Sequence, residues 1–356
     1  MATTFGIIGS GWRTDFYMRI MEALPEKFRV SGVVVRGVEK GRAFEQRWGV
    51  PTFRTLEEML SQTAPSFVVL SVPWAMTPDL IKEMADRGIP VLSETPPAPD
   101  VDHLNKLYHE ISKDARVQVA EQFAFQPQHA ARIAVVKSGV LGTVTQAQVS
   151  AAHGYHGMSI MRSLLDLGFA DAKIRGYNFA SQIVSGPNRE GDPIEEKMAM
   201  SNQVYAILEF DNKLGIFDFT GDQYFSWIRS SRLLVRGDRG ELMNDQLKYL
   251  KDYQTPVEMN LKRLNAGENG NLEGYYHKGI LAGDQWVYRN PFMPGRLTDE
   301  EIAIATCLQK MGEYVEGGPS FYSLAEAAQD HYLGIKIKEA VDSGETVQTT
   351  KQSWAQ

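Results

Sequence analysis

The residues with the clearest chemical role come at the start of the chain, where Gly9, Ser10 and Gly11 follow an apolar run at 5–8. Glycines at such a turn let the backbone approach a pyrophosphate without a Cβ atom in the way. The helix expected next would face the anion with free N–H groups and its positive dipole end. We therefore predict a dinucleotide site formed by five consecutive residues, Gly9, Ser10, Gly11, Trp12 and Arg13.

The glycine pattern alone does not decide between this site and an ordinary tight turn. In G-x-G-x-x-G the third glycine allows close packing of helix on strand, and here Thr14 stands in its place. The elements that follow the turn must settle the choice.

A second group of reactive side chains is His153, Tyr155 and His156, all within four residues. Imidazole titrates near neutrality without special help, so the two histidines are candidates for proton transfer. In a loop or first helical turn the three rings would crowd one pocket. The alternative is structural, with polar residues at a helix start and His156 capping it or bonded to a backbone carbonyl.

Strands and helices alternate through the first 123 residues at intervals of about twenty residues, with short connections, as in right-handed crossovers of a parallel sheet. Ligands bind such sheets at the carboxyl ends of the strands, which supports the dinucleotide site. Strands are expected at 5–8, 30–37, 66–73, 90–94 and 116–123, and helices after residue 11 and at 55–60, 77–87 and 101–111.

The end of the second strand bears on the choice of cofactor. A site for NAD usually has an acidic residue there to bind the ribose 2′-OH, whereas this chain has Val35 and Arg36. Arg36 could pair with a 2′-phosphate or stack on adenine, which favours NADP. The alternative is a solvated surface arginine, so we expect NAD or NADP.

From residue 141 the sequence pattern changes to strands in which apolar and polar residues alternate with a period of two. This pattern is typical of a sheet with one buried face. Residues 185–193 and much of 253–297 are interpreted as loops, the second long enough for a lid or a partner contact. Helices at 299–316 and 323–343 end the chain. The aromatic group near the second loop suits a carbohydrate or a subunit interface, or ordinary packing; it comprises Tyr275, Tyr276, His277, Trp286 and Tyr288.

Composition restricts the class of protein. With 356 residues the chain suits two domains, and a net charge of −7 without a basic run makes nucleic acid and anionic membranes poor partners. Cys307, the one cysteine, is expected to be a small buried hydrophobe. No membrane span, signal peptide or metal-ligand spacing stands out, so we expect a cytoplasmic protein without a metal.

Taken together, the motifs resemble the Gfo/Idh/MocA family of nicotinamide-dependent oxidoreductases over essentially the whole chain. The matching segments are GIIGSG, VLSVP, VLSETPPA, EQFAFQP and SGVLGTV, in that order. The resemblance implies an α/β protein with an N-terminal Rossmann domain, taken as 1–123. It further implies an α/β domain with a large, open, mostly antiparallel sheet, taken as 124–356. A nicotinamide at the junction and a homodimer or homotetramer paired through the sheet are also implied.

The resemblance extends the cofactor site to residues at three further strand ends. They are Ser71, Val72 and Pro73, then Glu94, Thr95 and Pro96, and finally Gln122 near the nicotinamide carboxamide. Glu94 would shape the nicotinamide end and is also a catalytic candidate. Its alternative role is to close the strand by accepting backbone N–H bonds.

Departures from the family pattern affect the chemistry. The family's E-K-P lysine, which can hold and polarise a substrate hydroxyl, is Thr95 here. In our register His156 matches the family's proton-accepting histidine, while Ala152 and Ser159 replace its two aspartates. General acid–base assistance contributes roughly 10² to 10⁴ in rate, so the chain must be slow or use other groups. His156 is the first candidate for proton transfer, followed by His153 and Tyr155.

Three functions remain open from the sequence. The first is hydride transfer between a nicotinamide and a sugar, polyol or glycoside. The second is redox-neutral glycoside cleavage with a tightly bound NAD, which the missing lysine keeps in consideration. The third is a non-catalytic protein that retains the dinucleotide fold.

Overall fold

The computed structural model describes residues 2–355, which form two compact units. The first unit comprises the chain up to Pro127 together with Arg263–Gly279 and Arg289–Ala328. The second comprises Gln128–Lys262, Ile280–Tyr288 and the chain from Gln329 onward. Each unit therefore draws on several segments of the sequence.

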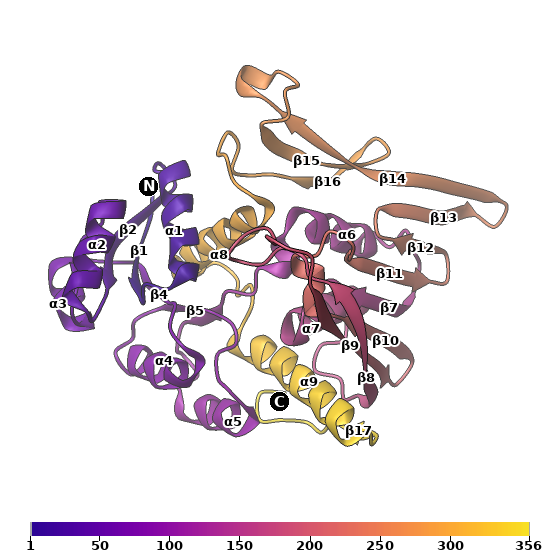
Figure 1. Ribbon diagram of the computed structural model, residues 1–356, viewed down its shortest axis with the longest axis horizontal. Coiled ribbons are helices and arrows are strands. Elements are labelled where there is room, and N and C mark those ends of the chain that lie inside the picture. The colour runs from indigo at the N-terminus through magenta and orange to yellow at the C-terminus, as the bar shows by residue number, and fades with distance from the viewer. Residues whose placement is uncertain (1, 356) are drawn as a thin grey trace. The chain divides into compact units, whose positions relative to one another are not determined.

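The first unit is built on a six-stranded, all-parallel sheet with the order β3-β2-β1-β4-β5-β6 (Figure 1). The order reverses at β1 and β4, where a doubly wound sheet opens a crevice for a dinucleotide. This confirms the predicted Rossmann-type domain. The strands are β1 (Thr3–Ile8), β2 (Phe28–Val34), β3 (Thr52–Phe53), β4 (Phe67–Leu70), β5 (Val91–Ser93) and β6 (Val117–Val119).

Buried apolar residues on both faces of the sheet explain why these short runs form central strands. Phe5 and Ile7 of β1 are fully buried, and the rings of Phe5 and Phe67 stack at 5.5 Å. Helices α1, α4 and α5 follow the sequence interpretation closely. The helices of this unit are α1 (Trp12–Ala23), α2 (Val38–Trp48), α3 (Leu56–Gln62), α4 (Thr77–Asp86), α5 (Val101–Glu110) and α8 (Asp299–Val315).

The sequence interpretation missed α2 and the two-residue β3. Helix α2 is strongly polar, and only Gly41 and Phe44 are buried along it, so its apolar period is too weak to predict a helix. Strand β3 is too short to show a period at all.

The second unit contains α6 (Pro127–Lys137), α7 (Gly154–Leu165) and most of α9 (Leu324–Ser343). Its large sheet is mostly antiparallel, with β7 and β10 as a parallel pair, which confirms the predicted fold class. The strand order is β16-β15-β14-β13-β12-β11-β7-β10-β9-β8-β17. The strands are β7 (Val144–Ser150), β8 (Lys173–Val184), β9 (Met198–Phe210), β10 (Lys213–Phe219), β11 (Arg232–Gly237), β12 (Gly240–Met243), β13 (Gln246–Asp252), β14 (Thr255–Ala266), β15 (Tyr276–Ala282), β16 (Gln285–Arg289) and β17 (Val347–Gln348).

The interpretation of 253–297 as mostly loop was wrong, because β14, β15 and β16 occupy much of it. Ten of the twelve residues of β14 are not buried, so the alternation that signals a half-buried strand is absent. A strand exposed to solvent on both faces shows no apolar period in its sequence, so periodicity does not predict it. The loop at 185–193 does lie between β8 and β9, as expected.

One face of the second unit's sheet is covered by helices and the other is open. An added Cβ at Gly215 would lie 2.3 Å from Met161 of α7, and one at Gly176 would lie 2.8 Å from Val341 of α9. The opposite face exposes Tyr177 and Phe179 of β8 by 61% and 57%. Among residues 2–355, no helix has the length and apolar character needed to cross a bilayer.

Candidate functional site

The N-terminal turn requires glycine at position 9. Gly9 has φ +111°, a conformation that L side chains rarely adopt, and an added Cβ would lie 2.0 Å from the carbonyl oxygen of Ser71. The ends of β1 and β4 therefore approach each other across a position without a side chain.

Gly11 has a different role, because it leaves space open. It is the N-cap of α1 at φ −82° and ψ −179°, and no side chain caps the helix. An added Cβ at Gly11 would meet no atom within 4 Å. Backbone amides at the start of a twelve-residue helix that no side chain caps, next to the open space at Gly11, fit the pyrophosphate of a dinucleotide.

Thr14 accounts for the incomplete glycine pattern. The residue is fully buried, and its hydroxyl lies 3.2 Å from the carbonyl oxygen of Gly9 and 3.3 Å from Oγ of Ser71. The threonine therefore links the glycine turn to the end of β4 by hydrogen bonds. Val72 follows Ser71 against the same turn, and Pro73 begins the short helix η1 (Trp74–Met76).

Glu94 follows β5 and lies in a polar cluster inside the first unit. Its carboxylate accepts a hydrogen bond of 2.5 Å from the hydroxyl of Tyr17 and lies 3.7 Å from Nε of Arg13. Arg13 also pairs with Glu300 at 2.8 Å. Burial, and after it the negative charge of Glu94, raises the pKa of Tyr17 well above its usual value, so the phenol stays a donor.

This cluster corrects one alternative for Glu94, that it closes the strand by accepting backbone N–H bonds. The partners are the side chains of Tyr17 and Arg13 instead. Sequence reasoning missed Tyr17 and Glu300, and the Tyr17 position on the buried side of α1 gave no polar signal. The next residues, Thr95 and the buried Pro96, are joined by a cis peptide bond.

Gln122 joins the same cluster. In the side-chain orientation that satisfies its amide, it donates to the carbonyl of Ala120 at 3.0 Å and accepts from Arg13 at 3.3 Å. The structure therefore brings together three predicted cofactor residues, Arg13, Glu94 and Gln122, from α1 and the ends of β5 and β6. Trp12, which precedes Arg13 in the sequence, is 53% exposed.

Arg36 is exposed, two residues beyond the end of β2. A second arginine that the sequence interpretation missed, Arg54, holds this loop. Its guanidinium donates to the carbonyls of Val35 and Gly37, the latter at 3.1 Å, and to Oγ1 of Thr52 at 2.7 Å. Arg36 is thus exposed on a turn that the hydrogen bonds of Arg54 hold in place.

The second unit brings His153, Tyr155 and His156 together at the start of α7. The ring of His156 lies 4.9 Å from that of His153 and 4.3 Å from that of Tyr155. His156 is 5% exposed, whereas His153, the N-cap, is exposed on one side. This matches the expectation that a loop or first helical turn would crowd the three rings.

Two further residues complete the cluster, and neither was marked by any sequence pattern. The hydroxyl of Tyr224 lies 2.8 Å from Nδ1 of His153 and accepts the His153 backbone N–H at 3.0 Å. His331 of α9 packs edge-on against Tyr155 at 5.6 Å. Partial burial of the His153 ring disfavours its charged form, and the neighbouring His156 adds to this effect. Together they lower the pKa of His153 to about 4.

Tyr224 ends a short helix, η3 (Gly221–Tyr224), that a polar network holds in place. Thr220 and Gln223 form a capping box, and the Gln223 amide donates to the carbonyl of the fully buried Ser150 at 2.8 Å. Nearby, Asp218 pairs with Arg232 at 2.6 Å. The network fixes η3 to the ends of β7 and β10.

The members of the aromatic group near 275 differ in burial. Tyr276 and His277 are buried, at 8% and 5% exposure, as in ordinary packing. Tyr275 is 43% exposed, and the guanidinium of Arg296 lies 3.4 Å from its ring centre. Among residues 2–355, no set of three or more His, Cys, Asp or Glu side chains is arranged to hold a metal ion.

Comparison with known families identifies the first unit. Residues 3–122 match the family model described as an oxidoreductase family with an NAD-binding Rossmann fold. This confirms the predicted class, an oxidoreductase with a nicotinamide dinucleotide as cofactor, and agrees with the open glycine turn. No curated protein sequence matches the chain.

Solved structures resemble the whole chain at low sequence identity. A levoglucosan dehydrogenase in complex with NADH and levoglucosan has a TM-score of 0.71 at 14% identity, covering 99% of this chain and 100% of that one. A myo-inositol dehydrogenase from Corynebacterium glutamicum has 0.65 at 15%, covering 99% and 100%. An oxidoreductase from Agrobacterium radiobacter, in complex with NAD⁺, L-tartaric acid and magnesium, has 0.67 at 15%, covering 98% of each. At these identities the likeness shows a shared fold.

Proposed function

We propose that the chain is an NAD(P)-dependent dehydrogenase or reductase of a sugar, polyol or glycoside and a member of the Gfo/Idh/MocA family, whose model matches residues 3–122. The observation that carries the proposal is the open N-terminus of α1 behind Gly9 and Gly11, which fits a pyrophosphate. The substrate class is supported by the fold shared with dehydrogenases named for levoglucosan and myo-inositol.

The dinucleotide would be held by the predicted cofactor residues of the first unit. The amides of Ser10 to Arg13 would face the pyrophosphate, and Ser71 to Pro73 would line the next strand end. The cluster of Arg13, Glu94 and Gln122 would shape the nicotinamide end, with Thr95 and Pro96. When bound, the nicotinamide supplies the group that accepts or returns a hydride.

Proton transfer would fall to the second unit. Oxidation of a carbinol releases a hydride and a hydroxyl proton, and an imidazole that is neutral at pH 7 can take the proton. His156 is our first candidate, with His153 and Tyr155 beside it. A histidine cluster fits a chain in which Thr95 replaces the lysine that the family resemblance would supply.

We also propose a preference for NADP. Arg36 is exposed at the end of β2, with no acidic residue at Val35 or Gly37 to bind a ribose 2′-OH. A free guanidinium there can pair with a 2′-phosphate.

The open face of the second unit's sheet supports pairing of two copies as a homodimer, or as part of a homotetramer. Tyr177 of β8 stacks on Tyr205 of β9 at 5.2 Å, and Phe179 and Ile207 extend this apolar area on the same face. Contiguous exposed apolar area of this kind is typical of subunit interfaces. Light scattering after chromatography would test this, with Tyr177→Asp expected to give monomers.

The activity test is a panel of sugars and polyols assayed with NAD and NADP by nicotinamide absorbance. Net reduction with at least one polyol or sugar supports the proposal. Cleavage of a chromogenic glycoside without net reduction would favour the redox-neutral alternative, which the absence of the lysine keeps open. A bound nucleotide with neither activity would mean a non-catalytic dinucleotide-binding protein.

A further inference from the structure

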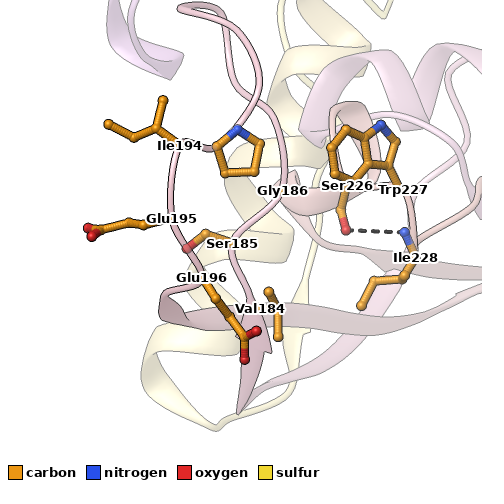
Figure 2. Close-up of a pocket in the computed structure, with 10 residues that line it drawn as sticks. Val184, Ser185, Gly186, Ile194, Glu195, Glu196, Ser226, Trp227 and Ile228 are labelled. Carbon is orange, nitrogen blue, oxygen red and sulfur yellow. Dashed lines mark hydrogen bonds between the residues drawn. The ribbon is translucent and has the colours of Figure 1, made fainter.

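A pocket of about 400 Å³ lies in the second unit between two loops that the sequence analysis left without a role. One wall is the loop after β8, and the other is the segment that follows η3 (Figure 2). The volume falls within the range of small-molecule sites. Its lining residues are Val184, Ser185, Gly186, Pro193, Ile194, Glu195, Glu196, Ser226, Trp227 and Ile228.

The most distinctive wall residue is Trp227. Its side chain is 71% exposed, and within residues 2–355 the indole makes no hydrogen bond and no ring contact. Ile194 and Ile228, which line the same pocket, are also exposed, and contiguous exposed apolar side chains of this kind mark ligand or partner sites. Its flat face and N–H group are available to a ligand in the pocket.

The opposite wall supplies hydrogen-bond acceptors. Neither Glu195 nor Glu196 forms an ion pair or hydrogen bond within the described part of the chain. In Figure 2 the Glu196 side chain points towards Val184, whereas the Glu195 side chain points away from Ser226 and Trp227. Ser185 adds a hydroxyl next to Val184.

This set of groups restricts the ligand. The lining contains no lysine or arginine and two carboxylates, so phosphates, nucleotides and acidic peptides are disfavoured. A second copy of the chain would have to desolvate the unpaired Glu196 carboxylate, which is costly without a cation. Sugar hydroxyls can donate to the carboxylate while the apolar face of the ring stacks on Trp227. A neutral pyranose-like ring satisfies both walls.

The pocket is joined to the histidine cluster through η3. Trp227 is three residues beyond Tyr224, whose hydroxyl bonds His153. The Ser226 N–H donates to the carbonyl of Asp222 at 2.7 Å, which continues the turn of η3 into the pocket wall. On the other side, an added Cβ at Gly186 would lie 2.9 Å from Cα of Ser226, so the two loops are in contact.

We propose that this pocket is a subsite for a second sugar ring, stacked on Trp227 and hydrogen-bonded to Glu196. The proposal rests on the proposed function, because it makes the substrate a glycoside or oligosaccharide, with the reacting ring elsewhere. The pocket then selects two-ring over one-ring substrates by adding contacts remote from the reacting carbon.

The first test is binding, which needs no turnover. Saturation-transfer NMR of the full chain with a panel of disaccharides and their constituent monosaccharides reports which rings are in contact. We expect disaccharide signals that weaken about tenfold in affinity in Trp227→Ala, the effect of a lost stacking contact of about 1.4 kcal/mol. Glu196→Gln should weaken the same ligands, and the control variant Tyr253→Ala, at an exposed aromatic residue away from the pocket, should not.

The second test separates this proposal from the proposed function. If wild-type protein reduces the cofactor with disaccharides, Trp227→Ala should raise their KM about tenfold and leave the KM for the monosaccharide unchanged. Equal effects on both substrates, or disaccharide binding that none of the variants alters, would overturn the subsite. A shift of Trp227→Ala to a smaller oligomer on light scattering would also overturn it, by making the pocket a subunit contact. Disaccharide binding without any redox activity would keep the subsite and reject the dehydrogenase.

Discussion

The hydroxyl of Tyr224 bonds both the ring and the backbone of His153, at 2.8 Å to Nδ1 and 3.0 Å to the N–H group. A backbone N–H can only donate, so the tyrosine oxygen is its acceptor, and the hydroxyl proton remains free for Nδ1. A hydroxyl that donates to Nδ1 leaves the neutral His153 ring with its proton on Nε2, on the opposite side of the ring. Tyr224 therefore orients a histidine that lies against His156.

Replacing Tyr224 with phenylalanine should test this orientation. Tyr224→Phe removes both hydrogen bonds while keeping the ring, so we expect kcat to fall about tenfold, the effect of losing roughly 1.4 kcal/mol of orientation. The pH profile of kcat should also shift, which a purely structural role would not cause. The control is Tyr253→Phe, an 83% exposed tyrosine on the turn between β13 and β14. An unaltered pH profile in Tyr224→Phe would contradict the orienting role.

His156 is the side chain on which the proposed proton transfer depends most. We expect His156→Ala to lower kcat by about 10² or more, the contribution of a general acid or base, while the affinity for the dinucleotide stays within about twofold. Steady-state kinetics and cofactor titration measure the two effects separately. Wild-type turnover in His156→Ala would assign the proton to His153 or Tyr155.

The two glycines of the N-terminal turn should respond differently to alanine. Gly11→Ala adds a methyl group in open space at an ordinary φ of −82°, so we expect an unchanged melting temperature and a dinucleotide affinity lowered tenfold or more. Gly9→Ala places a methyl group 2.0 Å from the Ser71 carbonyl at φ +111°, so it should lower the melting temperature as well. Thermal unfolding with and without NAD separates the two. A Gly11→Ala protein that binds NAD normally would exclude a pyrophosphate at this turn.

The arrangement of the candidate cofactor residues was largely predictable because it depends on local sequence. Parallel strands buried on both faces read as apolar runs, and a ligand site follows directly from the residues at their ends. Gly9, Ser71 and Glu94 were placed at the ends of their strands in this way, and their role in cofactor binding stays a prediction. Tyr17 could not be found, because its ring looks like one more core residue of α1 until the hydroxyl is seen to reach Glu94.

The histidine cluster was only half predictable, for a different reason. His153, Tyr155 and His156 are neighbours in sequence, so their meeting is local. Tyr224 and His331 come from elements about 70 and 175 residues away and approach only because the sheet and α9 bring them there. Strand β14 was missed because it is wetted on both faces, so no apolar period marks it.

Cofactor choice can be tested at the end of β2. Arg36→Asp replaces an exposed cation with the carboxylate that commonly accepts the ribose 2′-OH, so it should weaken NADP and favour NAD. We expect the ratio of the two Kd values to change by about tenfold or more, since a charge-assisted contact to phosphate is replaced by repulsion. Arg54 braces the same turn through the carbonyl of Gly37, so it is not a clean control, and Arg42→Asp serves instead on exposed α2. Equal ratios in Arg36→Asp and wild type would place Arg36 away from the ribose.

The stability of the protein should fall in mild acid because of His129. The residue is 7% exposed, its Nδ1 has no hydrogen-bond partner in the described part of the chain, and burial, followed by the charge of Arg132, lowers its pKa to about 3. Above pH 6.5 the imidazole is neutral in both folded and unfolded chains. Below it, the unfolded chain gains a proton that the folded chain refuses until about pH 3, so stability is lost as the pH falls through this window.

The slope of that loss approaches about 1.4 kcal/mol per pH unit for one histidine. His129→Leu removes the titrating group, so its free energy of unfolding should decline less steeply than that of the wild type between pH 6 and pH 4. Urea unfolding at several pH values measures both curves, and the other histidines contribute equally to each. Parallel curves would mean that His129 takes up its proton in the folded protein at an ordinary pH.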